Sequence, residues 1–110
     1  FSLVFKDGIK YKDIMKNLNN SEFLMATEKM SSNKVFSFGR DHGYHGRILS
    51  HGVVAEQSLH VKDNTLTGYC FTPQDGNALL SSVAGTVQHY YKNDWQKKME
   101  VFNRYIFKNI

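Results

Sequence analysis

The stretch Thr65-Leu66-Thr67-Gly68-Tyr69-Cys70-Phe71-Thr72-Pro73 marks the point where the chain changes from strand-like to helix-like sequence. Its β-branched and aromatic side chains are typical of a strand, and alternation places Leu66, Gly68 and Cys70 on one face. Pro73 lacks a backbone N–H and therefore ends the strand. We expect the face with Cys70 to be the inner one, so that Cys70 is a buried structural thiol.

Two helices are predicted after this strand. Asp75 or Asn77 can cap the first helix with a side-chain oxygen. Its apolar stripe has the helical spacing of about 3.6 residues and comprises Leu79, Leu80, Val83, Val87, Tyr90 and Tyr91. The second helix begins at Asp94, and its apolar residues at i, i+4, i+7 and i+11 are Trp95, Met99, Phe102 and Ile106.

Before the decisive stretch, short apolar runs bounded by turn residues predict further strands. These are Phe1–Phe5, the run of Val35, Phe36 and Phe38, Tyr44–Leu49 and Leu59–Val61. Apolar spacing predicts a helix over Ile9–Leu18 and a second helix that is capped by Asn20 or Ser21 and runs through Met30. The inner face of the second helix would consist of Phe23, Leu24, Thr27 and Met30. We therefore predict an α+β fold with N-terminal helices, a small antiparallel sheet and two C-terminal helices packed on it.

The composition fits one folded domain over residues 1–110. The chain has 110 residues, of which 41% are hydrophobic and 22% are charged, which favours a packed core over disorder. Cys70 is the single cysteine, so no internal disulfide can form, and we expect a reducing compartment at the site of action. No apolar run approaches the roughly 20 residues of a membrane span. Because the chain starts at Phe1, we expect it to be a piece of a longer protein.

Histidine is the residue type that points to chemistry. Four of the five histidines lie between residues 42 and 60, in a stretch rich in glycine and arginine; they are His42, His45, His51 and His60. Two imidazoles on either side of a phosphodiester can share RNA cleavage, one removing the 2′-hydroxyl proton and the other protonating the 5′-oxygen. A cation would stabilise the charge on phosphorus oxygens, and Arg40, Arg47 or Lys62 can supply it. Since the 2′-hydroxyl takes part, this chemistry predicts cleavage of RNA and not of DNA.

Three alternative interpretations stay open. A metal site could use Asp41, His42, His45 and His51, although the paired spacing of zinc ligands is missing. A cysteine hydrolase would pair Cys70 with His51, His60 or His89, of which His89 is most simply a surface residue of a helix. A non-catalytic binding module would use the His/Gly loop and the basic C-terminal helix to contact a protein or a nucleic acid.

The charge is modestly basic, at +4 overall. Its excess lies at the C-terminus, where residues 77–110 carry five basic side chains against two acidic ones. This bias fits an RNA substrate or an acidic protein partner without requiring either.

The middle of the chain, over about residues 39–91, resembles the nuclease modules of bacterial EndoU-type toxins. The resemblance rests on the Gly-His-rich stretch Asp41-His42-Gly43-Tyr44-His45-Gly46, followed by Thr-Gly-Tyr-Cys-Phe-Thr-Pro at residues 67–73 and an amphipathic helix. It implies His45 as one catalytic imidazole and His42, His51 or His60 as the other. It further implies Lys62 as the cation, Tyr69 and Thr72 as substrate contacts, and a 2′,3′-cyclic phosphate product.

The resemblance also implies a biological setting. Such modules, like the related disulfide-free RNase A-like toxins, act without a cofactor in the cytoplasm of a target cell. They are delivered as part of a larger secreted protein and are paired with an immunity protein, which is typically acidic.

Overall fold

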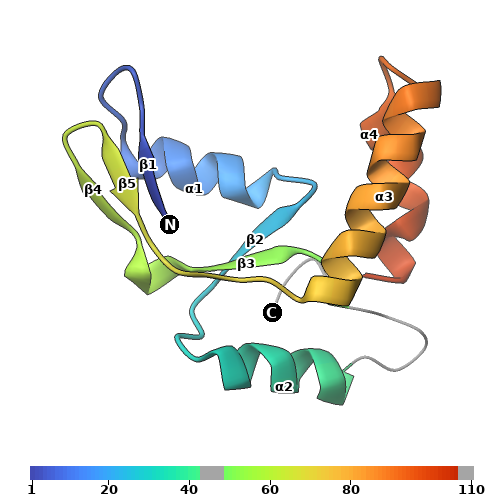
Figure 1. The fold of residues 1–110 in the computed structure, drawn as a ribbon, viewed down its shortest axis with the longest axis horizontal. Coiled ribbons are helices and arrows are strands. Elements are labelled where there is room, and N and C mark those ends of the chain that lie inside the picture. Colours follow the sequence, from blue (N-terminus) through green and yellow to red (C-terminus); the bar gives the residue numbers. More distant parts are fainter. Residues whose placement is uncertain (43–48, 107–110) are drawn as a thin grey trace.

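The computed structural model describes residues 1–42 and 49–106, except for the side chains of residues 39–42 and 103. Helices and short strands are mixed along the chain (Figure 1), which confirms the predicted α+β class. In chain order the elements are β1 (Ser2–Val4), α1 (Tyr11–Asn19), β2 (Leu24–Thr27), α2 (Ser32–His42), β3 (Gly52–Ala55), the 3₁₀ helix η2 (Glu56–Ser58), β4 (His60–Lys62), β5 (Thr65–Thr67), β6 (Cys70–Phe71), α3 (Gln74–Tyr90), α4 (Trp95–Met99) and the 3₁₀ helix η3 (Glu100–Arg104).

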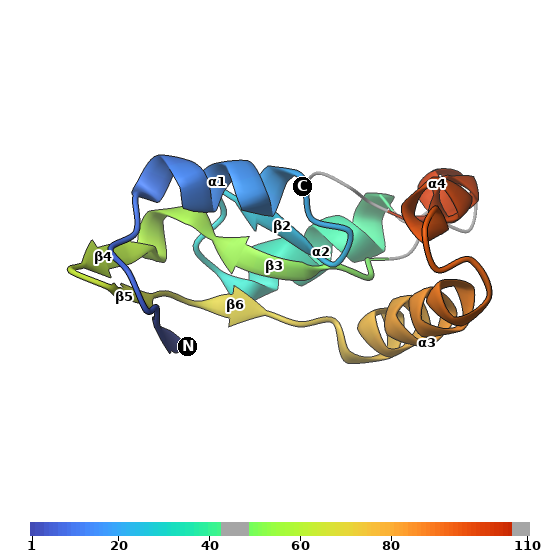
Figure 2. The same cartoon turned by 90° about the horizontal axis from the view of Figure 1, so that it is seen from above.

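The strands form two three-stranded sheets. Sheet A has the order β1-β5-β4 and is antiparallel, whereas sheet B has the order β2-β3-β6, with β2 parallel and β6 antiparallel to β3. Figure 2 shows that β3 continues toward β4 and that β5 continues into β6, so the two sheets share one long, bent hairpin. The Ser58 hydroxyl holds the bend, because it donates to the Ala55 carbonyl at 2.6 Å and accepts from the Tyr69 amide at 2.8 Å.

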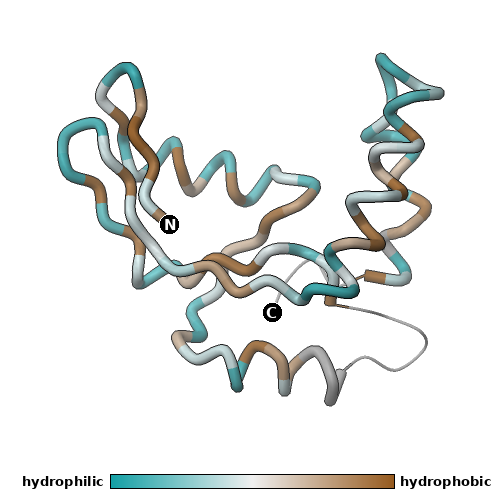
Figure 3. Tube along the Cα trace, in the orientation of Figure 1, coloured by the Kyte–Doolittle hydropathy of each residue, from teal (hydrophilic) through white to brown (hydrophobic). Residues whose placement is uncertain are grey.

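Much of the core of the described residues lies in two apolar clusters. The first packs α2 against sheet B and is built on Met25, Val35 and Val53. The second packs α3 against α4 and η3 and is built on Leu80, Ala84, Met99 and Ile106. Figure 3 shows hydrophobic residues along β2 and β3 and polar residues at the tip of the β4–β5 hairpin. The two C-terminal helices stand beside the sheets and pack on each other.

The predicted helix through Met30 is wrong, because this segment contains strand β2. Met25 and Thr27 are buried and alternate with less buried neighbours, which is the period of a strand. The Ser21 hydroxyl does accept from backbone amides, those of Phe23 at 3.1 Å and Leu24 at 3.0 Å. It caps a turn that leads into the strand, and the strand gains its hydrogen bonds from β3.

The predicted strand at residues 35–38 is also wrong, because these residues lie in helix α2. A parallel pair of strands needs a crossover connection, and α2 is the crossover between β2 and β3. Val35 is fully buried there, and Phe38, one turn further, packs on the same cluster. The predicted strand Tyr44–Leu49 lies outside the described residues except for Leu49, and β3, which is buried throughout, was not predicted.

The remaining elements follow the predictions with local changes. Strand β1, helix α1 and strand β4 lie where strands and a helix were expected, whereas the strand predicted over residues 66–72 is divided into β5 and β6 at the bend. Helix α3 has no side-chain cap, since the Asn77 side chain donates to the Ser50 carbonyl instead at 3.0 Å. Its inner stripe consists of Leu80, Val83, Ala84 and Val87. Residues Leu79, Tyr90 and Tyr91, expected on this stripe, are exposed.

Candidate functional site

Several predicted site residues lie beyond what the structure describes. His45 and Arg47 fall outside the described residues, and Arg40 and His42 belong to the last turn of α2, where only the backbone is described. The geometry of the predicted histidine site is therefore assessed for His51 and His60.

His51 is a buried residue. It directly precedes β3 and is 1% exposed. Its Nδ1 atom lies 3.4 Å from the Ser50 hydroxyl oxygen. The backbone carbonyl of Ser50 accepts a hydrogen bond from the side chain of Asn77, near the start of α3. The sequence predicts His51 in a polar loop, but the structure buries it directly before β3.

His60 lies at the other end of the bent hairpin. It is exposed on β4, beyond the end of β3. At about 3.3 Å per strand residue, β3 alone separates the His51 backbone from Ala55 by roughly 13 Å, and η2 follows before β4 begins. His51 and His60 therefore do not share one site, and the predicted pairing of His45 with one of the other histidines involves a residue outside the described ranges.

His60 shares a face of sheet A with Lys62. Residues directly opposite each other on paired strands point to the same side of a sheet. His60 lies opposite Thr67, and Lys62 lies opposite Thr65, while Thr67 is in turn paired with Ser2 of β1. We call this surface the His60 face; its members are Ser2, Val4, His60, Lys62, Thr65 and Thr67.

The opposite side of sheet A is apolar. Leu3 and Leu66 line a cavity together with Ile14 and Leu18 of α1. Helix α1 therefore covers that side, and the alternation of the strands turns His60 and Lys62 toward solvent. Both side chains are exposed.

Tyr69 extends the His60 face toward the bend. It is 68% exposed and lines a shallow pocket of about 280 Å³ with Ser58, Thr67 and Phe1. The Phe1 nitrogen donates to the Gly68 carbonyl at 2.9 Å, and the Gly68 amide donates to the Phe1 carbonyl at 3.2 Å; these two hydrogen bonds hold β1 beside this pocket. Thr72 is exposed as well, but it follows β6 and does not line this pocket.

A turn signal could have identified this face from the sequence. The β4–β5 hairpin has the two-residue loop Asp63-Asn64, and Asp63 has a φ of 56°, in the left-handed region that Asp and Asn tolerate. Such a loop fixes the register of the flanking strands, and the register places His60 opposite Thr67. Thr65, Thr67, Ser2 and Ser58 were missed because the hairpin was not assigned.

The thiol prediction is wrong. Cys70 is exposed rather than buried, because β6 is a two-residue edge strand of sheet B. It borders an apolar cavity whose lining residues include no histidine. His89 is exposed in the last turn of α3, as predicted, and its ring meets the Tyr90 ring edge-on at 5.2 Å.

Comparisons with known proteins identify no family. No family model matches the chain, and neither the curated proteins nor the solved structures include a match. In the part of the chain that the structure describes, no three His, Cys, Asp or Glu side chains are grouped to hold a metal ion. Within the same ranges, none of the helices has the length and apolar character needed to cross a membrane.

Proposed function

We propose that the protein is an endoribonuclease that needs no metal and binds RNA on the His60 face. The observation that supports this proposal is that an exposed imidazole and an exposed ammonium share one sheet face beside an exposed aromatic ring. His60 and Lys62 are two residues apart on one strand, so their Cβ atoms are separated by about 7 Å. A phosphate group fits between two side chains at that spacing.

Each group has a role in the proposed reaction. The neutral His60 imidazole accepts the proton of a ribose 2′-hydroxyl, whose oxygen then attacks phosphorus and forms the 2′,3′-cyclic phosphate. The Lys62 ammonium stabilises the negative charge that develops on the phosphorus oxygens. The departing 5′-oxygen takes a proton from solvent, to which the face is open. Tyr69 offers a ring on which an unpaired base can stack.

The proposal keeps the biological setting that the resemblance implies. An RNA-cleaving module of this kind would act in the cytoplasm of a target cell and would require an immunity protein in the producing cell. An acidic surface on that partner would complement Lys62 and cover His60.

The proposal is tested by RNA cleavage in excess chelator. His60→Ala is expected to lower the rate at least about 100-fold, the usual contribution of one acid–base group. Lys62→Ala and Tyr69→Ala are expected to lower it less. His45→Ala tests the second imidazole that the sequence resemblance implies. His89→Ala is the matched control, because His89 is also exposed but lies on α3.

Two results would reject the ribonuclease. The first is a parent protein that cleaves none of several RNA classes, and the second is cleavage by His60→Ala at the parent rate. Cleavage that the chelator abolishes would favour metal-dependent chemistry instead.

A non-catalytic binding module is the second candidate. The separation of His51 from His60 favours it. Among the histidine side chains that the structure describes, His60 is then the one that can transfer a proton at the His60 face. This candidate predicts an RNA or protein complex without turnover. His60→Ala should weaken this complex, because His60 is exposed on the proposed binding face.

A further inference from the structure

The turn between α3 and α4 lies at the opposite end of the molecule from the β4–β5 hairpin (Figure 1 and Figure 2). Exposed rings stand where α3 ends, and exposed lysines follow in the turn and on α4. We call this group the helix-tip surface; its members are His89, Tyr90, Tyr91, Lys92, Lys97 and Lys98. It shares no residue with the His60 face.

Contacts within the helix-tip surface order its side chains. The Lys98 ammonium lies over the Tyr91 ring, 5.0 Å from the ring centroid, and joins α4 to the end of α3. The His89 ring meets the Tyr90 ring edge-on, with the centroids 5.2 Å apart. The Asp94 amide donates to the Tyr91 carbonyl at 3.2 Å, which closes the turn. Side chains that are ordered before binding lose less conformational entropy when a ligand arrives.

The core contacts of α4 turn Lys97 outward. Trp95 and Met99 are one helical turn apart and both belong to the second core cluster. Trp95 also stacks on the Phe23 ring, with the centroids 6.1 Å apart. A helix that buries positions i and i+4 places position i+2 on its opposite side. Lys97 occupies that position, so its ammonium points away from the core.

Tyr90 presents the more accessible of the two tyrosine rings. It is 74% exposed, compared with 47% for Tyr91. It stands at one end of a shallow groove of about 500 Å³ that follows α3 past Gly85 and Thr86. A Cβ atom at Gly85 would meet nothing within 4 Å, so the groove is open there. A flat base therefore has room to lie against the Tyr90 ring.

The combination of rings and ammonium groups favours a single-stranded nucleic acid as the partner. Aromatic side chains stack on unpaired bases of any sequence, and lysines neutralise backbone phosphates. Residues 89–100 carry three lysines against two acids, Asp94 and Glu100, which gives a net charge of +1. Because this excess is small, the affinity depends on stacking as well as on charge. A strand that bears bases therefore fits the surface better than a plain polyanion.

We propose that the helix-tip surface binds single-stranded RNA as a second contact, apart from the His60 face. An unpaired base stacks on Tyr90, and Lys97 and Lys98 contact the phosphates beside it. This inference rests on the proposed function in naming RNA as the partner. The strand that is cut at His60 is thereby held at two ends of the molecule.

Fluorescence anisotropy of a labelled 2′-O-methyl RNA dodecamer tests the proposal. This probe lacks the 2′-hydroxyl that cleavage requires, so its binding is measured whether or not the protein is a ribonuclease. Tyr90→Ala is expected to weaken binding about tenfold, as the loss of one stacked base predicts. Tyr90→Phe keeps the ring and should bind as the parent does.

A charge-matched pair of variants tests the lysines. Each phosphate neutralised on a single strand contributes about 0.7 to the slope of log Kd against log salt concentration. Replacing Lys97 and Lys98 by alanine should therefore lower this slope by about 1.4. Replacing Lys12 and Lys16 changes the net charge equally, but these exposed lysines lie on α1, so the slope should stay close to that of the parent.

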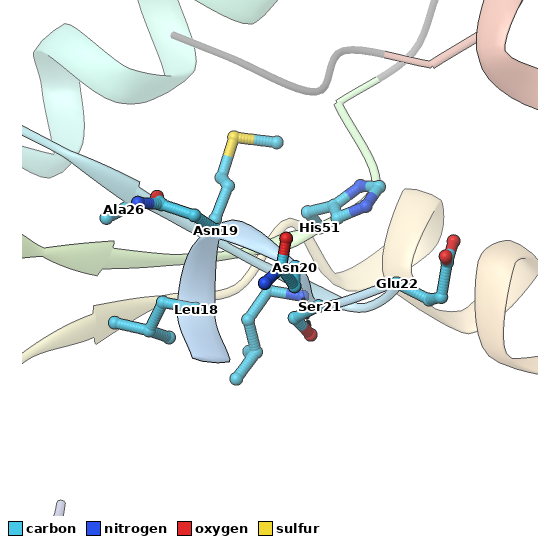
Figure 4. A pocket seen from close by; sticks show the side chains of 9 residues that line it. Leu18, Asn19, Asn20, Ser21, Glu22, Ala26 and His51 are labelled. Carbon is cyan, nitrogen blue, oxygen red and sulfur yellow. Dashed lines mark hydrogen bonds between the residues drawn. The ribbon is translucent and has the colours of Figure 1, made fainter. Parts of the chain in front are cut away.

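A further control concerns a different place where a base could enter. A polar pocket of about 450 Å³ lies between the end of α1 and His51, and Asn20 stands at its rim (Figure 4). Asn20→Ala should leave binding of the probe unchanged, because Asn20 is not part of the helix-tip surface. Thermal melting establishes that each variant is folded.

The proposal is overturned if the parent does not bind the dodecamer at about 100 μM protein and low salt. It is equally overturned if Tyr90→Ala binds as tightly as Tyr90→Phe, or if the two double-lysine variants have the same salt dependence. Equal weakening of heparin binding by Tyr90→Ala would contradict stacking, because heparin carries no bases. Binding by a parent that cleaves no RNA would reject the ribonuclease and keep the helix-tip surface, so the two failures are distinguishable.

Discussion

Replacing Gly76 by alanine is expected to destabilise the protein, whereas the same change at Gly85 is expected to stabilise it. Both glycines lie in α3. A Cβ atom on Gly76 would collide with the Leu49 carbonyl oxygen, and it would lie 3.0 Å from the carbonyl carbon of Leu49 and 3.2 Å from Cα of Ser50. A Cβ atom on Gly85 would meet nothing within 4 Å. The pair therefore compares one substitution in one helix with and without a backbone contact.

The magnitudes follow from two opposing terms. Alanine is favoured over glycine inside a helix by about 1 kcal/mol, and at Gly85 this gain is realised in full. At Gly76 the gain is outweighed, because the obstacle is backbone and cannot rotate away. Overpacking of this kind costs about 1–3 kcal/mol. Separating α3 from Ser50 also breaks the Asn77–Ser50 hydrogen bond, which contributes about 1 kcal/mol.

Urea unfolding followed by circular dichroism measures both variants against the parent. We expect Gly85→Ala to raise the free energy of unfolding by ~0.5–1 kcal/mol and Gly76→Ala to lower it by ~1–3 kcal/mol. If Gly76→Ala is as stable as Gly85→Ala, helix α3 does not approach Leu49 as closely as the structure has it, and this reasoning fails.

Two further predictions concern single side chains. Burial, the charge of Glu56 and a hydrogen bond to Glu56 raise the pKa of Tyr11 above 10.0, so the folded state holds this proton more tightly than the unfolded state. The resulting stabilisation is complete below pH 10 and is lost as the pH rises through the pKa of Tyr11 in the folded state. The free energy of unfolding, measured from pH 8 to 11.5, should show this loss in the parent and less of it in Tyr11→Phe. Parallel pH profiles of the two proteins would contradict the prediction. Because Cys70 is exposed, it should react with a chromogenic disulfide reagent within minutes without denaturant. Alkylated protein should keep its RNA cleavage, and loss of cleavage on alkylation would instead support the cysteine hydrolase.

The helices with long apolar stripes were predictable from the sequence. Trp95, Met99, Phe102 and Ile106 repeat at helical spacing, and all four take part in the second core cluster. The stripe persists although the helix changes to 3₁₀ geometry at Glu100. Helix α1 and the stop at Pro73 were predictable for the same reason, because each depends on neighbours within a few residues.

For the segments of β2 and α2, helix and strand were exchanged in the prediction: a helix was predicted where β2 lies and a strand where α2 lies. Residues 24–27 are too few to separate a strand period from a helical one, and Val35, Phe36 and Phe38 have strand propensity although they lie in a helix. Pairing with β3 makes residues 24–27 a strand, and the need for a crossover between the parallel strands β2 and β3 makes the segment with Val35 a helix.

The candidate site divides in the same way. The sequence by itself determined which groups can carry chemistry, namely the histidines, Lys62, Tyr69 and the single thiol, together with the alternation that places His60 and Lys62 on one side of a strand. Only the tertiary structure decided that His51 is buried while His60 faces solvent, and that Cys70 is exposed on an edge strand. The physical reason is that alternation and propensity act over a few residues, whereas burial depends on elements that are distant in the sequence and packed against one another.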